Sequence, residues 1–473
     1  MEGKKSSSGV VFKTDNLLVQ RLFDTAIQKL EENKRDFLGK TVIVDGAGYN
    51  KLYLESTPMT AEMYAKVDLE IADNIIGFFF DNQREDGRIP GSILMEDGKV
   101  TPQFNKIQGL YLPEAGFNLY YWLGRDKEYL KRLYHCLESF DDYLWKVRDS
   151  NGDGCLESWC QTDTGEDYAM RYGDASFWWE SEKAPEGFNV VPMASMDFMS
   201  YSYSCRNVCA KISAILENGK QDYWKNRAED VMRKIEEYLW NEEIGACFDR
   251  DNQGRVIPIL IHNTLRCMYF GAISRRNAER FVEEHLCNEN EFWTPMPLPS
   301  VALNDPMFRN IKTNNWSGQP NTLTYQRAIL ALERYGYEKL IPRLGRKLFE
   351  AVGKEFRFTQ QFDVYTGYPS CDPNDEATEG YGIDNFAPTM CAVLDYISRM
   401  YGIHLQEEEI WWGITGDINS EYTQVWGNHT YTLKYDGNLG CGFLNDKKIF
   451  EAGSGKRVVT DYEGNVIRYV DME

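Results

Sequence analysis

Apolar side chains recur three or four positions apart over most of the chain, which is the period of an amphipathic α-helix. The first such segment, 15–34, begins with Asp15 as its predicted N-cap, and Thr60 is the predicted N-cap of the second. Including these two, the pattern predicts helices over 15–34, 60–82, 107–123, 127–147, 191–216, 222–240, 260–270, 276–285, 321–335, 338–352 and 385–400. The sequence therefore predicts a mainly α fold.

Short and long connections alternate between the predicted helices, so that the helices come in pairs. The long connections are 83–106, 148–190, 286–320 and 354–384. A ring of helical hairpins produces this alternation, with the long loops on one rim, and six hairpins make an (α/α)6 toroid. An open α-solenoid and two separate bundles are the alternatives. No sequence repeat of about 34–45 residues is visible, which argues against TPR or HEAT repeats.

The pattern changes to β-type alternation after Gly402. The predicted strands lie at 422–435, 448–451 and 457–462, and after an EGN turn at 463–465. We therefore expect an (α/α)6 catalytic domain over 1–404 and a small β-rich C-terminal appendage over 405–473.

Composition and charge restrict the partners. The chain has 473 residues, of which 42% are hydrophobic and 14% aromatic, so a large core is possible. The net charge of -21 argues against nucleic acid and anionic membrane surfaces, which bind basic patches. No apolar run approaches the ~18 residues of a membrane span, and the N-terminus lacks the apolar region of a secretory signal. We expect a cytoplasmic protein with a small, neutral or modestly charged substrate.

The motifs for metals and nucleotide cofactors are missing or incomplete. The eleven cysteines include no C-x-x-C pair, and we interpret them as free thiols. The DSNGDG motif at 149–154 resembles a calcium loop, but Cys160 stands where the bidentate glutamate is needed. No G-x-G-x-x-G or Walker motif follows a predicted strand. His262 is the one histidine of five that lies in an apolar run, which favours a structural role. We therefore expect no metal and no cofactor.

Two long loops combine carboxylates with aromatic residues. The loop 357–385 is glycine-rich and holds six carboxylates between Asp363 and Asp384, and its aromatic content argues against disorder. The loop 149–180 holds carboxylates close to tryptophans: Glu157, Asp163, Glu166 and Asp167 beside Trp159, Trp178 and Trp179. Aromatic rings stack on the apolar faces of sugars, and partial desolvation raises the pKa of a carboxyl so that it can act as an acid. A solvated acidic loop is the alternative interpretation.

Further candidates for substrate contact lie outside these loops. Tyr64 and Arg88 belong to dense polar segments that bracket the second predicted helix. Trp316 and Gly318 place a ring and a bare backbone just before the helix 321–335. A stacking platform and a packed loop anchor are equally good interpretations of this last pair.

From about residue 50 to 400, the chain resembles the clan that contains glycoside hydrolase family 63 (mannosylglycerate and glucosylglycerate hydrolases, processing α-glucosidase I) and the family 37 trehalases. QREDGRIPG resembles the clan's Q-x-x-D-G-x-I-P, and RDSNGDGCLES resembles R-D-x-D-G-D-G-L. TGEDYAMRY resembles S-G-M-D-N-S-P-R-W, the loop that carries the general acid. The resemblance thus implies Asp167 as the acid, Arg171 beside it, and, from MASMDFMSYSYS, Asp197 at a substrate-side position.

Two further motifs of the clan imply substrate-lining residues. NNWSGQPNTLTYQRAILALERYGY resembles Y-W-R-G-P-x-W-x-x-x-N-Y-L; Trp316 and Gly318 match, and Gln319 replaces a proline. TEGYGID resembles the trehalase Q-E-G-F-G-W-T, which implies that Glu379 lines the cavity, with Ile383 in place of tryptophan.

The clan's base loop reads E-K-Y-D or E-N-Y-N-P-x-T-G, and TQQFDVYTG resembles it with one departure. Alignment on the shared FD and TG residues places the catalytic base on Gln360, whose amide cannot usefully take a proton from water. Three explanations are open. The glutamine is a deliberate substitution that traps a substrate, another carboxylate such as Glu379 or Asp363 is the base, or the protein is a non-hydrolytic relative.

The resemblance implies an inverting, exo-acting glycoside hydrolase for a small α-glycoside. Asp167 would protonate the leaving oxygen, and a glutamate at position 360 would activate water on the opposite face, with the two carboxyls roughly 6.5–9.5 Å apart. A non-hydrolytic carbohydrate-binding protein is one alternative. A sugar epimerase or isomerase on the same toroid is another, but it would need paired histidines. The sequence does not indicate an oligomeric state.

Overall fold

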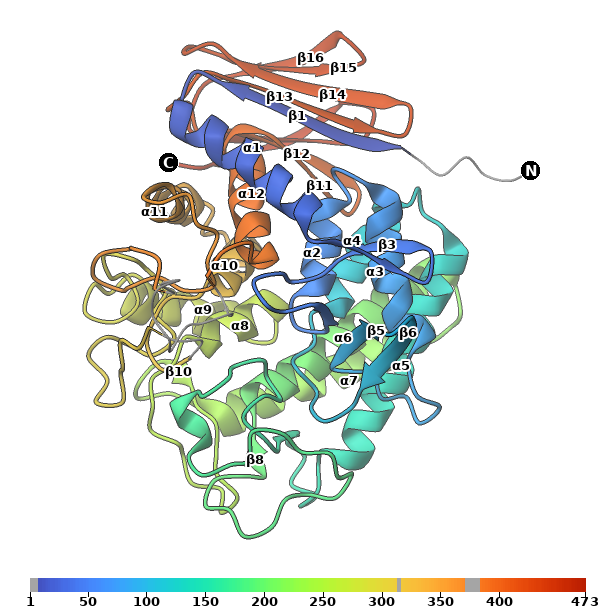
Figure 1. Ribbon diagram of the computed structural model, residues 1–473, viewed down its shortest axis with the longest axis vertical. Coiled ribbons are helices and arrows are strands. Elements are labelled where there is room, and N and C mark those ends of the chain that lie inside the picture. Colours follow the sequence, from blue (N-terminus) through green and yellow to red (C-terminus); the bar gives the residue numbers. More distant parts are fainter. Residues whose placement is uncertain (1–6, 313–315, 371–382) are drawn as a thin grey trace.

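The computed structural model describes residues 7–312, 316–370 and 383–473 (Figure 1). Its helices are α1 (Leu17–Glu32), α2 (Thr57–Tyr64), α3 (Leu69–Asp81), α4 (Leu112–Trp122), α5 (Lys127–Val147), α6 (Met196–Leu216), α7 (Gln221–Lys234), α8 (Asn263–Phe270), α9 (Arg275–Phe281), α10 (Thr322–Tyr335), α11 (Leu340–Gly353) and α12 (Ala387–Tyr401). Single π-helical turns extend α7 and α9 through Ile235–Leu239 and Val282–Leu286. The mainly helical prediction is confirmed.

The even-numbered helices form an inner ring. Each of α2, α4, α6, α8 and α10 contacts the next even-numbered helix, and α12 contacts α2. The odd-numbered helices lie outside, each against at least one inner helix. The contact between α12 and α2 closes the ring, which an open α-solenoid would lack.

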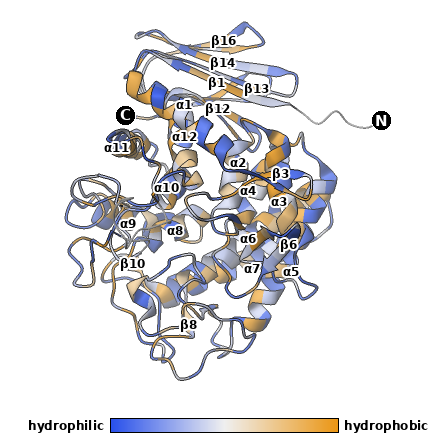
Figure 2. Cartoon of the chain, in the orientation of Figure 1, coloured by the Kyte–Doolittle hydropathy of each residue, from blue (hydrophilic) through white to orange (hydrophobic). Residues whose placement is uncertain are grey.

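The sequence explains which helices lie inside. Every residue of α4 and of α12 is buried, because both helices are apolar around most of their circumference. By contrast, α7 buries only Trp224, Ala228 and Val231 and turns its charged residues to solvent. Figure 2 shows both types of helix, with two-sided colouring on the outer ones.

The connections between helices differ at the two ends of the ring. Short turns at 65–68, 123–126, 217–220, 271–274 and 336–339 join each inner helix except α12 to the outer helix that follows. The longer segments, including 82–111, 148–195 and 354–386, lead from an outer helix to the start of an inner one. The long loops therefore gather where the inner helices begin, as the alternation in the sequence predicts.

Both predicted N-caps are wrong. The segment 60–82 is not one helix, because the chain turns at 65–68 between α2 and α3. The Asp68 carboxylate caps α3 by accepting hydrogen bonds from the amides of Glu70 and Ile71, while Thr60 lies inside α2. The N-cap of α1 is Asn16 instead of Asp15, and its side chain accepts from the Val19 amide at 3.2 Å.

A β layer covers one end of the ring. One sheet has the order β1-β13-β14-β15-β16 and the other β11-β12-β17-β18. The strands are β1 (Ser8–Thr14), β11 (Ile403–Gln406), β12 (Glu409–Ile414), β13 (Ser420–Trp426), β14 (His429–Tyr435), β15 (Gly440–Leu444), β16 (Lys447–Ala452), β17 (Lys456–Thr460) and β18 (Val466–Asp471). The predicted strand 422–435 is thus a hairpin. The hydropathy pattern does not predict β1, which brings the N-terminal segment into the β layer. The layer is therefore built from segments near both ends of the described chain.

The β layer binds the ends of the inner helices that lie away from the long loops (Figure 1, top). The Trp426 indole N–H donates to the Trp122 carbonyl at the end of α4, at 2.8 Å. The Gln424 amide donates to the Lys66 carbonyl just after α2, at 2.9 Å. These contacts leave the rim with the long loops as the open end of the ring.

Shorter strands lie within the segments that connect the helices. They are β2 (Lys34–Phe37), β3 (Lys40–Ile43), β4 (Lys51–Tyr53), β5 (Ser92–Glu96), β6 (Lys99–Gln103), β7 (Glu157–Ser158), β8 (Met193–Ala194), β9 (Trp240–Asn241) and β10 (Ala246–Cys247). The ten cysteines within the described ranges form no disulfide. In the same ranges, none of the helices combines the length and the apolar character that crossing a membrane requires.

Candidate active site

The beginnings of the inner helices meet at the rim that carries the long loops. Glu55 lies two residues before the start of α2, Asp197 lies in the first turn of α6, and Asn263 is the first residue of α8. Helix N-termini carry partial positive charge and unpaired amide groups, so this end of the ring favours carboxylates.

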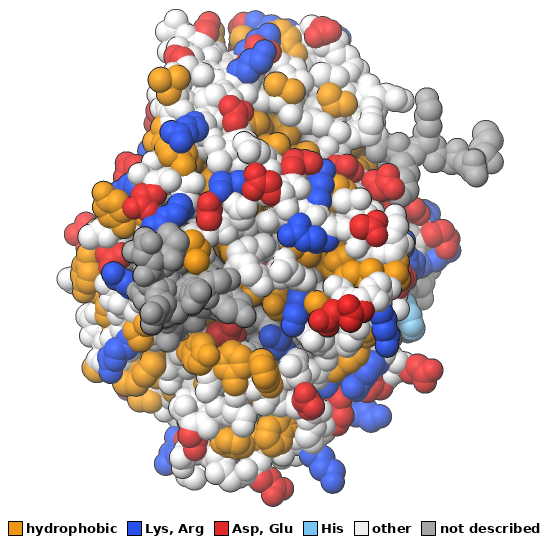
Figure 3. All heavy atoms as spheres, viewed as in Figure 1, with side chains coloured by type: hydrophobic (Ala, Val, Ile, Leu, Met, Phe, Trp, Pro, Cys, Tyr) orange, Lys and Arg blue, Asp and Glu red, His pale blue; other side chains and the backbone are white. Residues whose placement is uncertain are grey.

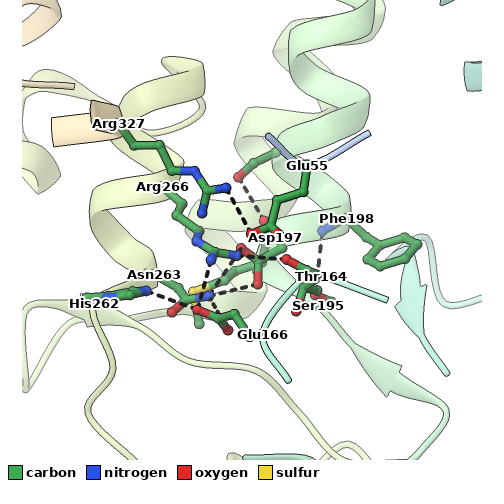
Figure 4. A network of polar contacts seen from close by, with 12 residues as sticks. Glu55, Thr164, Glu166, Ser195, Asp197, Phe198, His262, Asn263, Arg266 and Arg327 are labelled. Carbon is green, nitrogen blue, oxygen red and sulfur yellow. Dashed lines mark hydrogen bonds and ion pairs between the residues drawn. The ribbon is translucent and has the colours of Figure 1, made fainter. Parts of the chain in front are cut away.

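A charge cluster of Glu166, Arg171, Asp197, Asp249 and Arg266 occupies this place (Figure 4 labels three of them). Each member is at most 2% exposed. Arg171 pairs with Glu166 at 2.5 Å, with Asp197 at 2.7 Å and with Asp249 at 2.5 Å. Arg266 approaches Glu166 at 3.0 Å and Asp197 at 3.5 Å. Two arginines thus bridge three carboxylates from different segments.

Neighbouring polar groups complete the cluster. The Asn263 side-chain amide donates to Asp197 at 3.0 Å and to Glu166 at 3.1 Å. His262 Nε2 lies 2.9 Å from Glu166 Oε1, and its ring meets the ring of Trp316 edge-on at 5.6 Å. This environment fits the structural role that the sequence analysis favours for His262.

The electrostatics of the cluster fix the state of Glu166. Burial alone would raise the pKa of Glu166, but Arg266, Arg171 and His262 hold it well below its usual range. Burial also raises the pKa of Asp249 to about 6, against the attraction of Arg171. Burial lowers the pKa of His262, so we expect a neutral imidazole whose Nε2–H donates to Glu166. Glu166 is therefore ionised near neutral pH and is a poor proton donor.

Asp167 follows Glu166 but has a different environment. Its side chain is half-buried, and its backbone carbonyl accepts a hydrogen bond from the Trp316 amide at 3.1 Å. The charge of Asp167 contributes to a raised pKa of Glu55 and works against the lowering of the pKa of Lys106 by burial, so both groups lie near it.

Glu55 is the second buried carboxylate at this place. It pairs with Arg327 at 2.9 Å, as Figure 4 shows, and accepts from the Gln108 side chain at 3.3 Å. Burial raises its pKa despite Arg327 and Arg266. Glycine is favoured at residue 165, because its φ is +75° and a Cβ there would lie 2.1 Å from the Glu55 carboxyl carbon, so that Glu55 would have to move.

The segment 316–322 contacts both predicted catalytic loops. Its first residue, Trp316, binds Asp167 as described above. Near its other end, the Pro320 carbonyl accepts from the Phe362 amide at 3.2 Å and the Thr322 amide donates to the Gln360 carbonyl at 3.1 Å. The loop with the predicted acid and the loop with Gln360 are therefore anchored to the same short segment.

The side chain of Gln360 is 5% exposed, and its Oε1 accepts a hydrogen bond from the Tyr49 hydroxyl at 3.2 Å. Asp363, three residues on, holds the loop together. It accepts from the Asn310 side chain at 2.7 Å and from the Thr366 hydroxyl at 2.8 Å. These hydrogen bonds lower the pKa of Asp363 although partial burial opposes them. Asp363 thus has the role of a turn residue, which argues against it as the base.

Other predicted site residues contact different partners. The Tyr64 side chain is fully buried and its hydroxyl donates to Glu31. Arg88 is 1% exposed and pairs with Glu182 at 2.8 Å. The Trp159 indole donates to Glu157 at 2.9 Å. The substrate contacts predicted for Tyr64, Arg88 and Trp159 stay predictions.

The remaining predicted residues lie on or beside the rim. Trp316 is 3% exposed and packs against His262, which favours the loop-anchor interpretation. At Gly318 a Cβ would lie 2.0 Å from the Arg309 carbonyl oxygen, so only glycine fits. Glu379 lies outside the described residues.

Sequence reasoning missed Asp249, Asn263, Arg266 and Arg327. Asn263 and Arg266 stand three positions apart at the start of α8, so they share one face of that helix. Arg327 lies in the apolar helix α10 and is 1% exposed. A charged residue within such an apolar pattern is rarely buried without a partner, and this was the available signal.

Comparisons with known proteins agree with the resemblance in the sequence. The family model of the mannosylglycerate hydrolase MGH1-like glycoside hydrolase domain matches residues 59–382. No curated protein sequence matches the chain.

Solved structures show the same fold. The GH63 mannosylglycerate hydrolase from Thermus thermophilus, in complex with glucose, has a TM-score of 0.65 at 17% identity, covering 80% of this chain and 100% of that chain. Neutral trehalase Nth1 from Saccharomyces cerevisiae has a TM-score of 0.57 at 15% identity, covering 76% of this chain and 74% of that chain. A protein described as a sialidase has a TM-score of 0.73 at 14% identity, covering 96% of this chain and 42% of that chain.

The match of the family model extends over well more than half of the chain and includes both predicted catalytic positions, 167 and 360. The resemblance to glycoside hydrolase family 63 and to the trehalases is thereby confirmed. The chain belongs to the family of mannosylglycerate hydrolase MGH1-like glycoside hydrolases.

Proposed function

We propose that this glycoside hydrolase is an (α/α)6 toroid that removes a terminal α-linked sugar from a small glycoside or oligosaccharide with inversion at the anomeric carbon. The observation that carries the proposal is the shared anchor 316–322, which contacts the loops of Asp167 and Gln360 at the open rim of the ring. The charge cluster, which includes Asp197 and Arg171, holds the loop of Asp167 in place through its ion pairs. The cytoplasmic location stays a prediction.

Asp167 is the proposed general acid. Glu166, the neighbouring carboxylate, is held ionised by two arginines and cannot take this role. Asp167 lies close to Glu55, whose pKa is raised by burial and to a smaller extent by the charge of Asp167. Asp167 would give its proton to the leaving oxygen as the glycosidic bond breaks.

Position 360 is the proposed place of the base. A glutamate there has the same shape as Gln360 and would still accept the hydrogen bond from Tyr49. In the active form it would take a proton from a water molecule that attacks the face of the sugar opposite Asp167. Gln360 itself supports the alternative function, a carbohydrate-binding protein that does not hydrolyse.

The configuration of the first sugar released tests the proposal. The chain and its Gln360→Glu variant would be incubated with a panel of α-glycosides and followed by proton NMR during the first minutes. We expect the β-anomer to appear first in whichever protein hydrolyses. Initial release of the α-anomer would contradict the inverting mechanism, and tight binding without release by either protein would favour the non-hydrolytic alternative.

A further inference from the structure

Tyr168 directly follows the proposed acid, Asp167, in the chain. Its backbone conformation is unfavourable for an aromatic residue, and its ring is exposed. Its φ is +60°, in the left-handed region, and its side chain is 53% exposed. The clan's acid loop, S-G-M-D-N-S-P-R-W, has asparagine at this position, a residue that adopts this conformation readily. An aromatic residue does so only at a conformational cost, and such outliers concentrate at functional sites.

Two further rings continue the surface that Tyr168 begins. The Tyr168 and Phe177 ring centroids are 5.1 Å apart with the rings tilted by 37°, and those of Phe177 and Trp178 are 5.2 Å apart with the rings at 70°. The Trp178 side chain is 54% exposed. These three residues form what we name the aromatic platform.

The platform stands on a fixed backbone. The Phe177 carbonyl accepts from the Thr162 hydroxyl at 2.7 Å, and the Ser176 carbonyl accepts from the Gln161 amide at 3.0 Å. On the far side of Trp178, the Trp179 amide donates to the Asn105 carbonyl at 2.9 Å. An ordered loop therefore presents the rings to solvent. Their exposed apolar area lies in water, and binding a ligand against the rings would bury it.

Acidic and basic side chains are interspersed over the face of the molecule that Figure 3 draws, with several hydrophobic side chains gathered on its lower half. The arginines of the charge cluster are each bound to carboxylates. A ligand with a flat, uncharged ring therefore fits such a surface better than an anionic ligand does.

In the proposed function, Asp167 protonates the glycosidic oxygen, which departs with the leaving group. The leaving group then lies next to Tyr168, the residue that follows Asp167 in the chain. We propose that the aromatic platform binds a pyranose ring of the leaving group, so that the substrate is an α-linked di- or oligosaccharide. The apolar face of the pyranose stacks on Tyr168, Trp178 contacts the edge of the bound saccharide, and the sugar hydroxyls remain in water. This inference rests on the proposed function and adds the class of the leaving group.

Titration calorimetry with matched ligands tests the inference. For each sugar of a panel, the ligands are the methyl α-glycoside, the matching α-disaccharide and the α-glycoside of D-glycerate. The proteins are the unaltered chain, Tyr168→Asn, Trp178→Ala and the control Leu38→Asn. Leu38 also has a positive φ, +54°, and a 62% exposed side chain, but it lies in the turn between β2 and β3.

We expect Tyr168→Asn and Trp178→Ala each to weaken disaccharide binding roughly tenfold and to leave methyl glycoside binding unchanged. Leu38→Asn should change neither affinity. Because asparagine relieves the left-handed strain, both asparagine variants should unfold at a higher temperature, by roughly 1–2 °C. Weaker disaccharide binding together with higher stability in Tyr168→Asn would identify Tyr168 as a residue kept for its ligand.

Three results would overturn the inference. Equal weakening of both ligands by Tyr168→Asn would mean that Tyr168 shapes the cleft in general. An unchanged affinity of the variants for the disaccharide would show that the aromatic platform is not part of the binding site. Stronger binding of the glycerate glycoside than of the disaccharide would assign a small acid as the leaving group. If the unaltered chain binds no methyl α-glycoside at all, the proposed function itself fails.

Discussion

Four consecutive residues, Gly165 to Tyr168, have four different environments at the rim. Gly165 lets the loop pass against Glu55, where any side chain would collide. Glu166 is locked between two arginines, Asp167 is half-buried beside Glu55, and Tyr168 is exposed. These environments distinguish the two adjacent carboxylates: Glu166 is held ionised by the arginines, which leaves Asp167 as the candidate for the proposed acid role.

The acid role of Asp167 predicts a dependence on the leaving group. In a hydrolytically active form of the chain, Asp167→Asn should reduce kcat by roughly 10²–10⁴-fold on substrates with poor leaving groups, because these need protonation. Dinitrophenyl glycosides, whose leaving group needs no proton, should lose much less. Equal losses on both substrate types, measured by initial rates, would contradict this role.

Asp45 provides a prediction about pH. Its side chain is buried and accepts from the Ser56 hydroxyl at 2.6 Å, and burial raises its pKa to about 8. The folded protein thus keeps this proton up to about pH 8, whereas the unfolded chain releases it near pH 4. The unfolded state binds fewer protons between these limits, so this residue makes stability fall as pH rises from about 4 to 8.

Asp45→Asn should therefore flatten the decrease in unfolding temperature over this pH range, as measured by differential scanning calorimetry. Glu128→Gln, a change in an exposed residue of α5, is the matched control and should leave the pH profile unaltered. An unchanged slope in Asp45→Asn would show that other groups cause it.

At the scale of elements, the sequence predicts long periodic helices well and local turns poorly. The predicted helix 127–147 coincides with α5, because Asp126 caps it and its apolar stripe is continuous. The break between α2 and α3 escaped prediction because Tyr64, Ala65 and Val67 continue the apolar pattern through the turn. Strand β1 escaped because its partner, β13, lies more than 400 residues away in sequence.

The break before α3 can be tested through its cap. Asp68→Ala removes the carboxylate that accepts from the Glu70 and Ile71 amides, and we expect it to lower the free energy of unfolding by about 1 kcal/mol. Urea denaturation followed by circular dichroism measures this. Glu70→Gln, on the exposed side of the same turn, is the control. A loss no larger than in that control would mean that tertiary packing alone sets the start of α3.

At the scale of the molecule, the ring has one open and one closed end. The β layer closes the end where α4 and α10 finish, and the proposed catalytic loops lie at the other. The motif order in the sequence predicts which loops carry the acid and the base, and both of these loops contact the segment 316–322. It could not locate Arg266 or Arg327, because which charges meet inside a ring depends on how its helices are rotated, and this is a tertiary property.

The β layer and the ring should unfold together. Arg457 of β17 pairs with Glu333 of α10 at 2.6 Å, and both side chains are 2% exposed. Arg457→Ala leaves Glu333 buried with a weaker partner and should cost about 3 kcal/mol. Hydrogen exchange should then rise in peptides of both elements. Lys434→Ala, in an exposed pair with Glu421, is the control. A rise confined to the β layer would show that the two parts are independent.

In the proposed function, positions 167 and 360 act as an acid and base pair on an α-glycoside. The most direct test compares initial hydrolysis rates of the unaltered chain, Gln360→Glu, and Gln360→Glu combined with Asp167→Asn, on one panel of α-glycosides. We predict a gain of roughly 10²–10⁴-fold from the glutamate and the loss of that gain in the double variant. No gain on any α-glycoside from a folded Gln360→Glu protein, or a gain that survives without Asp167, would contradict the account.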